Sequence, residues 1–155
     1  MGKLFRACLA AAVVTLLVTL PVTWSVSAAV IPAQMKGSDV SVTVTYTGKG
    51  PVDATHEIWV FLFDTPSIGA GARPLSAQTI TKSGGAAVFK AVTTDPVYIA
   101  VAYDEKGDYD GNAGPPPNGT PIAMYGADAK GVAGPLKTAG GAKVKLSFND
   151  ARRMQ

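Results

Sequence analysis

The sequence contains very little cysteine and histidine. Cys8 is the single cysteine and His56 the single histidine among 155 residues. A disulfide within the chain and a thiolate zinc or iron–sulfur site each need more than one cysteine, and a multi-histidine metal site needs more than one histidine. No Gly-x-Ser-x-Gly motif accompanies His56. These absences favour a protein that is not an enzyme and leave a hydrolase built on His56 as the weaker alternative.

Residues 1–29 have the pattern of a secretory signal peptide, which predicts a helix that is removed on export. The start is positively charged, an apolar run covers residues 7–20, Pro21 breaks the run, and small residues occupy positions 27–29. The run is shorter than the roughly 20 apolar residues that a membrane span needs. The alternative is an uncleaved membrane anchor. We expect cleavage, a secreted or periplasmic location, and no stable membrane span in the mature chain.

The mature chain has almost no net charge. Removing the signal peptide removes Lys3 and Arg6, so that Lys+Arg falls from 14 to 12 against 11 Asp+Glu. A charge of about +1 provides no basic field for nucleic acid, and we exclude nucleic acid as a partner. Arg152 and Arg153 lie in a short basic tail, residues 151–155, which we expect to be solvated.

Residues after position 29 show no 3.6-residue apolar period, and strands are predicted instead. Residues 30–37 form a loose leader, and residues 38–150 have the size of a single domain. Ser83-Gly84-Gly85 has hairpin composition and predicts that the strands on either side pair with each other. Period-2 patterns predict strands at residues 39–47, 57–63, 75–82, 86–92, 97–103, 120–125 and 142–148, with a weaker segment at 132–136. The pattern is typical of an all-β Greek-key β-sandwich of about seven strands.

Three segments of the sequence resemble a known family. Residues 58–63 (IWVFLF), 85–89 (GAAVF) and 97–105 (VYIAVAYDE) are similar to the prealbumin-like sandwich, which includes transthyretin-like and carboxypeptidase regulatory-like domains and is related in form to immunoglobulin-like folds. A strand that enters an Asp/Gly/Asn loop also resembles certain small secreted bacterial proteins. The resemblance implies a β-sandwich with a non-catalytic role and assigns no functional residue.

An acidic segment, residues 104–112 (DEKGDYDGN), follows the predicted strand 97–103. Ca²⁺ takes six to eight oxygen ligands from carboxylates, amides and backbone carbonyls. The segment supplies four carboxylates and one amide, and this composition predicts a calcium-stabilised loop. The candidate ligands are Asp104, Asp108, Asp110 and Asn112.

Two further features bear on this loop. Gly107 and Gly111 would let the backbone turn its carbonyl groups inward, and Asp64 would complete the site if its strand pairs with 97–103. The alternative is a plain polar turn, because Asp, Gly and Asn are common turn residues.

The predicted strand 57–63 is apolar on both faces. Trp59, Phe61 and Phe63 alternate with Ile58, Val60 and Leu62, which predicts a central strand whose second face meets a covering loop or a partner. An exposed aromatic row would indicate a carbohydrate- or peptide-binding accessory module. The loop at residues 67–74 carries a single charge, Arg73. We therefore expect an exported, non-enzymatic protein with a binding or structural role and an unknown protein or carbohydrate ligand.

Export generates the first prediction. Mass spectrometry of secreted or periplasmic material will show an N-terminus near Ala29 or Val30, because the small residues at positions 27–29 fit signal peptidase. Intact protein that begins at Met1 and is recovered in the membrane fraction would contradict cleavage.

Overall fold

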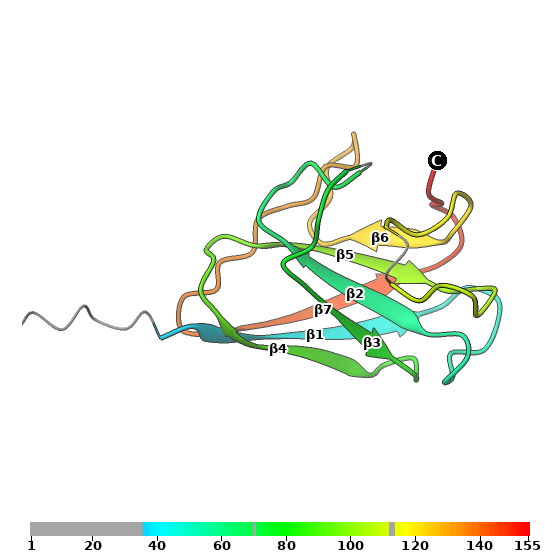
Figure 1. The fold of residues 1–155 in the computed structure, drawn as a ribbon, viewed down its shortest axis with the longest axis horizontal. Coiled ribbons are helices and arrows are strands. Elements are labelled where there is room, and N and C mark those ends of the chain that lie inside the picture. Colours follow the sequence, from blue (N-terminus) through cyan, green and yellow to red (C-terminus); the bar gives the residue numbers. More distant parts are fainter. Residues whose placement is uncertain (1–35, 70, 112–113) are drawn as a thin grey trace, which may run out of the picture. The chain divides into compact units, whose positions relative to one another are not determined.

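A computed structural model describes residues 36–69, 71–111 and 114–155. The predicted signal peptide, leader residues 30–35 and Asn112 lie outside the described residues. Within the described part the chain forms strands, turns and loops without a helix, and Figure 1 shows how these elements are arranged. A search of the same residues finds no helix that is long and apolar enough to cross a membrane.

Seven strands form two sheets (Figure 1). The first sheet has three strands in the order β4-β1-β7, and the second has four in the order β3-β2-β5-β6. The all-β class and the number of strands agree with the sequence prediction. The strands are β1 (Ser38–Tyr46), β2 (Ile58–Phe63), β3 (Ser76–Ile80), β4 (Ala86–Val92), β5 (Tyr98–Tyr103), β6 (Ile122–Met124) and β7 (Ala142–Phe148).

Strand β1 is the centre of the three-stranded sheet. It pairs antiparallel with β4 and parallel with β7, where Val42 lies opposite Val144. Alternate residues of β1, from Val40 to Tyr46, are buried, as the period-2 pattern predicted. Strand β7 is an edge strand, and its outward-facing Lys143 and Lys145 are exposed. Such lysines oppose pairing with a further chain.

Strand β2 is a central strand of the four-stranded sheet, as its apolar faces predicted. It pairs antiparallel with both β3 and β5, and Val60 lies opposite Val101. The inner face of β2 packs into the core between the sheets. Among the described residues, this core has buried apolar side chains from both sheets, including Val40, Val42, Val44, Ile58, Val60, Leu62, Ile99, Val101, Tyr103, Val144, Leu146 and Phe148.

The hairpin prediction at Ser83-Gly84-Gly85 is wrong. Strands β3 and β4 on either side of this turn belong to different sheets. The turn pairs instead with β1: Gly84 N donates to Val44 O over 2.8 Å, and Val44 N donates to Gly85 O over 3.0 Å. Glycine provides the reversal of the chain, with φ +82° at Gly84, but it does not determine which strand becomes the partner.

The segment at residues 132–136 forms no strand. A single bridge joins Leu136 to Val97.

The central strands generate the second prediction. Val60 is 0% and Val101 1% exposed, so truncation of either to Ala will lower the free energy of unfolding by about 1–3 kcal/mol through lost burial and a residual cavity. The matched control is Val88→Ala, because Val88 is 40% exposed and should change stability by less than about 0.5 kcal/mol. Urea melts provide the measurement. Equal losses at all three positions would contradict the assigned core.

Candidate functional site

The acidic loop is organised around the carboxylate of Asp104. Asp104 is 7% exposed and follows directly after β5. Its Oδ1 accepts hydrogen bonds from the backbone N–H groups of Lys106, over 3.3 Å, and Gly107, over 2.8 Å. Its Oδ2 accepts one from Tyr109 N over 3.0 Å. Both oxygens of Asp104 therefore face the backbone of their own loop, as in an Asp-initiated turn.

The two glycines of the loop, Gly107 and Gly111, have backbone conformations that favour glycine. Gly107 has φ +70° and Gly111 φ +74°, which is left-handed backbone that glycine adopts without strain. A Cβ added at Gly111 would come within 2.5 Å of the Trp59 ring. The glycine therefore also lets the loop lie directly on the outer face of β2.

The described residues do not gather around a metal position. No group of three or more His, Cys, Asp or Glu side chains is placed to hold a metal ion in the part of the chain that the structure describes. Asp108 and Asp110 are exposed, Asp104 is engaged by backbone N–H groups, and Asn112 lies outside the described residues. The calcium site stays a prediction, and the observed hydrogen bonds are those of a carboxylate-bound turn.

Asp64, which we expected to complete the calcium site, lies at the end of the strands opposite to Asp104. Strands β2 and β5 pair as expected, but they are antiparallel, with Ile58 opposite Tyr103 and Phe63 opposite Tyr98. Asp64 follows Phe63 and is therefore separated from Asp104 by the length of the strands. The backbone that meets Asp104 belongs to Glu57, whose carbonyl accepts from Asp104 N over 2.9 Å.

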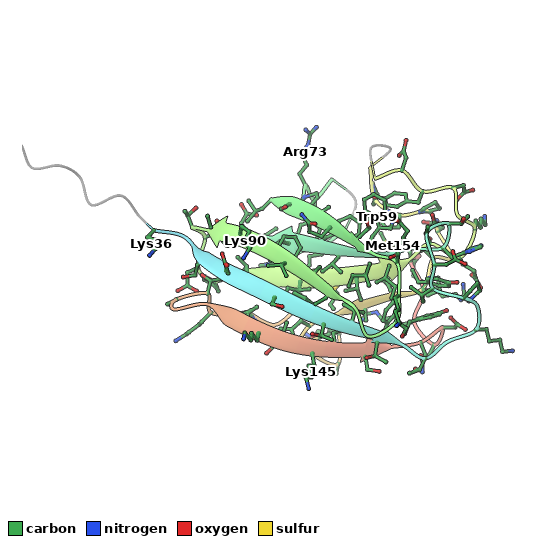
Figure 2. The ribbon with its side chains drawn as sticks, turned by 90° about the horizontal axis from the view of Figure 1, so that it is seen from below. Lys36, Trp59, Arg73, Lys90, Lys145 and Met154 are labelled. Atoms are coloured by element: carbon green, nitrogen blue, oxygen red, sulfur yellow. The ribbon has the colours of Figure 1, made fainter. Side chains whose placement is uncertain are left out.

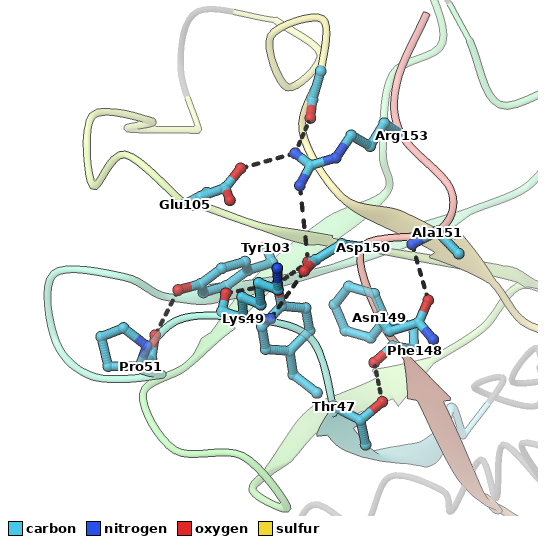
Figure 3. Close-up of polar contacts among 12 residues, drawn as sticks. Thr47, Lys49, Pro51, Tyr103, Glu105, Phe148, Asn149, Asp150, Ala151 and Arg153 are labelled. Atoms are coloured by element: carbon cyan, nitrogen blue, oxygen red, sulfur yellow. Dashed lines mark hydrogen bonds and ion pairs between the residues drawn. The ribbon is translucent and has the colours of Figure 1, made fainter.

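A polar network lies beside this loop (Figure 3). Tyr46 donates a hydrogen bond from its hydroxyl to Asp150 Oδ1, and Lys49 N donates to Asp150 Oδ2 over 2.9 Å. The hydrogen bond from Tyr46, followed by that from Lys49, holds the pKa of the Asp150 carboxyl below its usual value. Burial, followed by the hydrogen bond to Asp150, raises the pKa of the Tyr46 phenol. Tyr103 donates from its hydroxyl to Pro51 O over 2.6 Å.

The basic tail is part of this network rather than simply solvated. Arg153 Nη1 lies 2.8 Å from Glu105 Oε2 and donates to Gly119 O over 2.6 Å. Met154 N donates to Thr120 O over 2.9 Å, and Ile122 N donates to Arg152 O over 3.0 Å. The tail therefore pairs with the segment that leads into β6. Such pairing covers backbone groups that an edge strand would otherwise expose.

His56 lies in a surface turn. Its Nδ1 is 3.0 Å from Asp53 Oδ1, and the same oxygen accepts from the backbone N–H groups of Thr55 and His56. The hydrogen bond from His56 N is the largest cause that lowers the pKa of Asp53. Among the described residues, no serine or threonine hydroxyl is hydrogen-bonded to the His56 ring. The pair thus resembles a turn-stabilising contact more closely than a hydrolytic centre.

The outer face of the four-stranded sheet carries an apolar groove of about 550 Å³. Its floor consists of Phe61, Phe63, Ala100 and Ala102. One wall comes from the loop between β2 and β3, with Ile68 and Arg73. The other wall comes from the segment between β5 and β6, with Tyr109, Gly111, Pro115 and Pro116, and Met124 of β6 lines the groove as well. The segment between β5 and β6, which is rich in Pro and Gly, thus forms a wall of the groove.

The aromatic residues on the outer face of the four-stranded sheet pack against one another and do not form an exposed row. Trp59 and Phe61 stack with ring centroids 6.1 Å apart, and Tyr109 meets Trp59 edge-on at 5.1 Å. Phe61 is 6% and Phe63 5% exposed. Trp59 Nε1 is buried without a hydrogen-bond partner among the described groups. The exposed row expected of a carbohydrate-binding module is not seen for Phe61 and Phe63, which belong to the floor of the groove but are almost fully buried.

The groove was not predicted from the sequence. The feature of the sequence that bears on it is the pair of small residues, Ala100 and Ala102, in the strand that pairs with β2. Arg73 is exposed, and among the described residues that line the groove it carries the only charge. Figure 2 shows the Arg73 side chain standing away from the ribbon, on the side opposite Lys145.

The carboxylate of Asp104 generates the third prediction. Asp104→Ala will lower the free energy of unfolding by about 1–3 kcal/mol, because three backbone N–H groups lose their acceptor. Asp108→Ala is the matched control, since Asp108 is exposed, and should change stability by less than about 0.5 kcal/mol.

Thermal melts of these proteins with millimolar Ca²⁺ and with chelator test the calcium prediction in the same experiment. A higher midpoint with Ca²⁺ that Asp108→Ala abolishes would support a metal site. Identical midpoints with Ca²⁺ and with chelator would contradict a calcium site and would agree with a turn held by the Asp104 carboxylate. A stable Asp104→Ala variant would contradict the role given to Asp104.

Comparison of the chain with protein-family models, with curated proteins and with solved structures gave no match. The fold and the groove are therefore described from this chain alone, and the resemblance to prealbumin-like sandwiches stays a prediction.

Proposed function

We propose that this protein is an exported, non-enzymatic β-sandwich that binds an apolar ligand on the outer face of its four-stranded sheet. The observation that carries the proposal is the groove over Phe61, Phe63, Ala100 and Ala102. Its volume of about 550 Å³ lies within the range of roughly 300–1,000 Å³ that is typical of small-molecule sites.

The composition of the groove supports an apolar ligand. The floor is provided by two paired strands, and its four side chains are all apolar. Both walls contain Gly and Pro, so that few flexible polar side chains face the groove. Burial of apolar surface contributes about 25 cal/mol per Å², and an apolar ligand over this floor would gain that contribution.

The alternatives have weaker support. A carbohydrate ligand would use exposed aromatic faces, whereas Phe61 and Phe63 are almost fully buried. A peptide could lie in the groove and remains the alternative within the same binding class. A hydrolase would need a nucleophile near His56, whose ring contacts Asp53 in a surface turn.

The finer description of the fold belongs to the same proposal. We infer a Greek-key, prealbumin-like arrangement, and the path of the chain supports it. The chain passes from one sheet to the other after β1, β3, β4 and β6, and the first and last strands pair in parallel. A calcium-stabilised loop remains an auxiliary part of the proposal.

A binding experiment with a neutral apolar probe tests the proposed function. The protein, expressed with its own N-terminal segment, will bind N-phenyl-1-naphthylamine with an increase in fluorescence. Ala100→Phe will weaken binding by about tenfold or more, because a phenyl group fills the floor of the groove. Ala77→Phe fills the groove from β3 and is the second variant, in case the first does not fold.

The matched control is Val88→Phe, which adds a phenyl group at an exposed position of β4 in the other sheet. Melts establish that each variant folds. Unchanged binding by both groove variants, or equal loss in the Val88 control, would contradict the groove as the binding site.

A further inference from the structure

We infer that the apolar ligand of the groove carries an anionic group, such as a carboxylate, and that Arg73 recognises it. This inference rests on the proposed function, because it concerns the same groove. Arg73 is the only charged residue among the described residues that line the groove. A single cation at the edge of an apolar site selects amphiphiles whose charge can reach it.

The guanidinium of Arg73 is available for a ligand. It makes no hydrogen bond or ion pair with any described residue, whereas Arg152 and Arg153 both contact groups of the protein. Its side chain stands out from the loop between β2 and β3, as Figure 2 shows, so that its head is in water. A planar guanidinium pairs with a carboxylate through two parallel hydrogen bonds, a geometry that an ammonium group does not reproduce.

The position of Arg73 at one end of the groove gives the ligand one orientation. Arg73 belongs to the loop that follows Phe63, at the end of β2. Tyr109 and Gly111 lie in the loop that follows β5, and the antiparallel pairing places that loop at the opposite end of the strands. Lys106, Asp108 and Asp110 of that loop are exposed and do not line the groove, so they place no charge inside it. The anionic head therefore lies at the Arg73 end and the apolar tail runs toward Tyr109.

The floor of the groove is short. It runs from Phe61 to Phe63 along β2, a step of two residues or roughly 7 Å at 3.3 Å per residue. An extended alkyl chain of medium length, as in dodecanoate, would cover this floor and reach the walls that contain Ile68 and Tyr109. The inferred ligand is thus a medium-chain apolar anion, with its carboxylate at the mouth of the groove.

Calorimetry with two probes of equal length tests the inference. Dodecanoate and dodecan-1-ol will be titrated into the protein, expressed with its own N-terminal segment, at pH 8. The protein will bind dodecanoate about tenfold more tightly than the alcohol, which corresponds to about 1.4 kcal/mol. Arg73→Ala will abolish this preference and leave the affinity for the alcohol unchanged. High salt will reduce the preference, because Arg73 is exposed to solvent.

Two control variants locate the effect. Arg73→Lys keeps the charge without the paired geometry and will retain part of the preference. Lys145→Ala removes an exposed cation of β7 on the other sheet and will change neither affinity.

The outcomes separate the inference from the proposed function. Equal affinity for both probes, with Ala100→Phe weakening both, would overturn anion recognition and keep the groove as an apolar site. An equal loss of affinity for both probes in Arg73→Ala would also overturn the inference, because Arg73 would then maintain the shape of the site rather than bind the anionic group. Absence of binding by either probe would overturn the proposed function itself. Self-association that buries the groove, seen by sedimentation, would overturn both by placing a second copy there.

Discussion

The antiparallel pairing of β2 with β5 is the constraint on which the rest of the structure depends. Both strands are apolar on both faces, so their pairing creates two buried layers from one pair of strands. The inner layer joins the core between the sheets. The outer layer, with Phe61 and Ala100, needs a cover, and the loops on either side of these strands provide it only in part. The direction of pairing also places the Asp104 loop and the Arg73 loop at opposite ends of the same face.

The acidic loop is best understood as the support of one wall of the groove. The carboxylate of Asp104 gathers three backbone N–H groups, and the last of them belongs to Tyr109, whose ring packs edge-on against Trp59 and Phe61. The turn held by the Asp104 carboxylate thus fixes the side chain of Tyr109 over the sheet. Hydrogen bonds to a charged acceptor contribute more than those between neutral groups. Arg153 adds a second connection, because it links the tail to Glu105 in this loop.

The sequence predicted the strands much better than their partners. Alternation in β1, β2 and β7 follows directly from the period of a strand, and the buried faces agree with it. Which strand pairs with which depends on contacts between distant residues, and the turn at Ser83-Gly84-Gly85 carried no information about them. The same limit explains why the prediction for Asp64 was wrong. The residue pattern of a strand does not show whether it will pair parallel or antiparallel with its neighbour. The role of Asp104 had a local signal, because an Asp side chain in a turn commonly accepts hydrogen bonds from backbone N–H groups that follow it, as from Lys106 here.

The two alanines of β5 show why a groove is harder to predict than a core. Alternating small residues on a strand are compatible with close packing and with a vacant floor, and the difference lies in what the neighbouring loops bring. Here Ala100 is 8% and Ala102 2% exposed. Tyr109, Ile122 and Met124 pack against the same cluster, so this chain's own side chains cover most of the two alanines. These covering side chains line the groove together with the loop before β3. The groove is therefore the part of this face that the loops and β6 leave uncovered, and a pattern of alanines in one strand carries no information about such a cover.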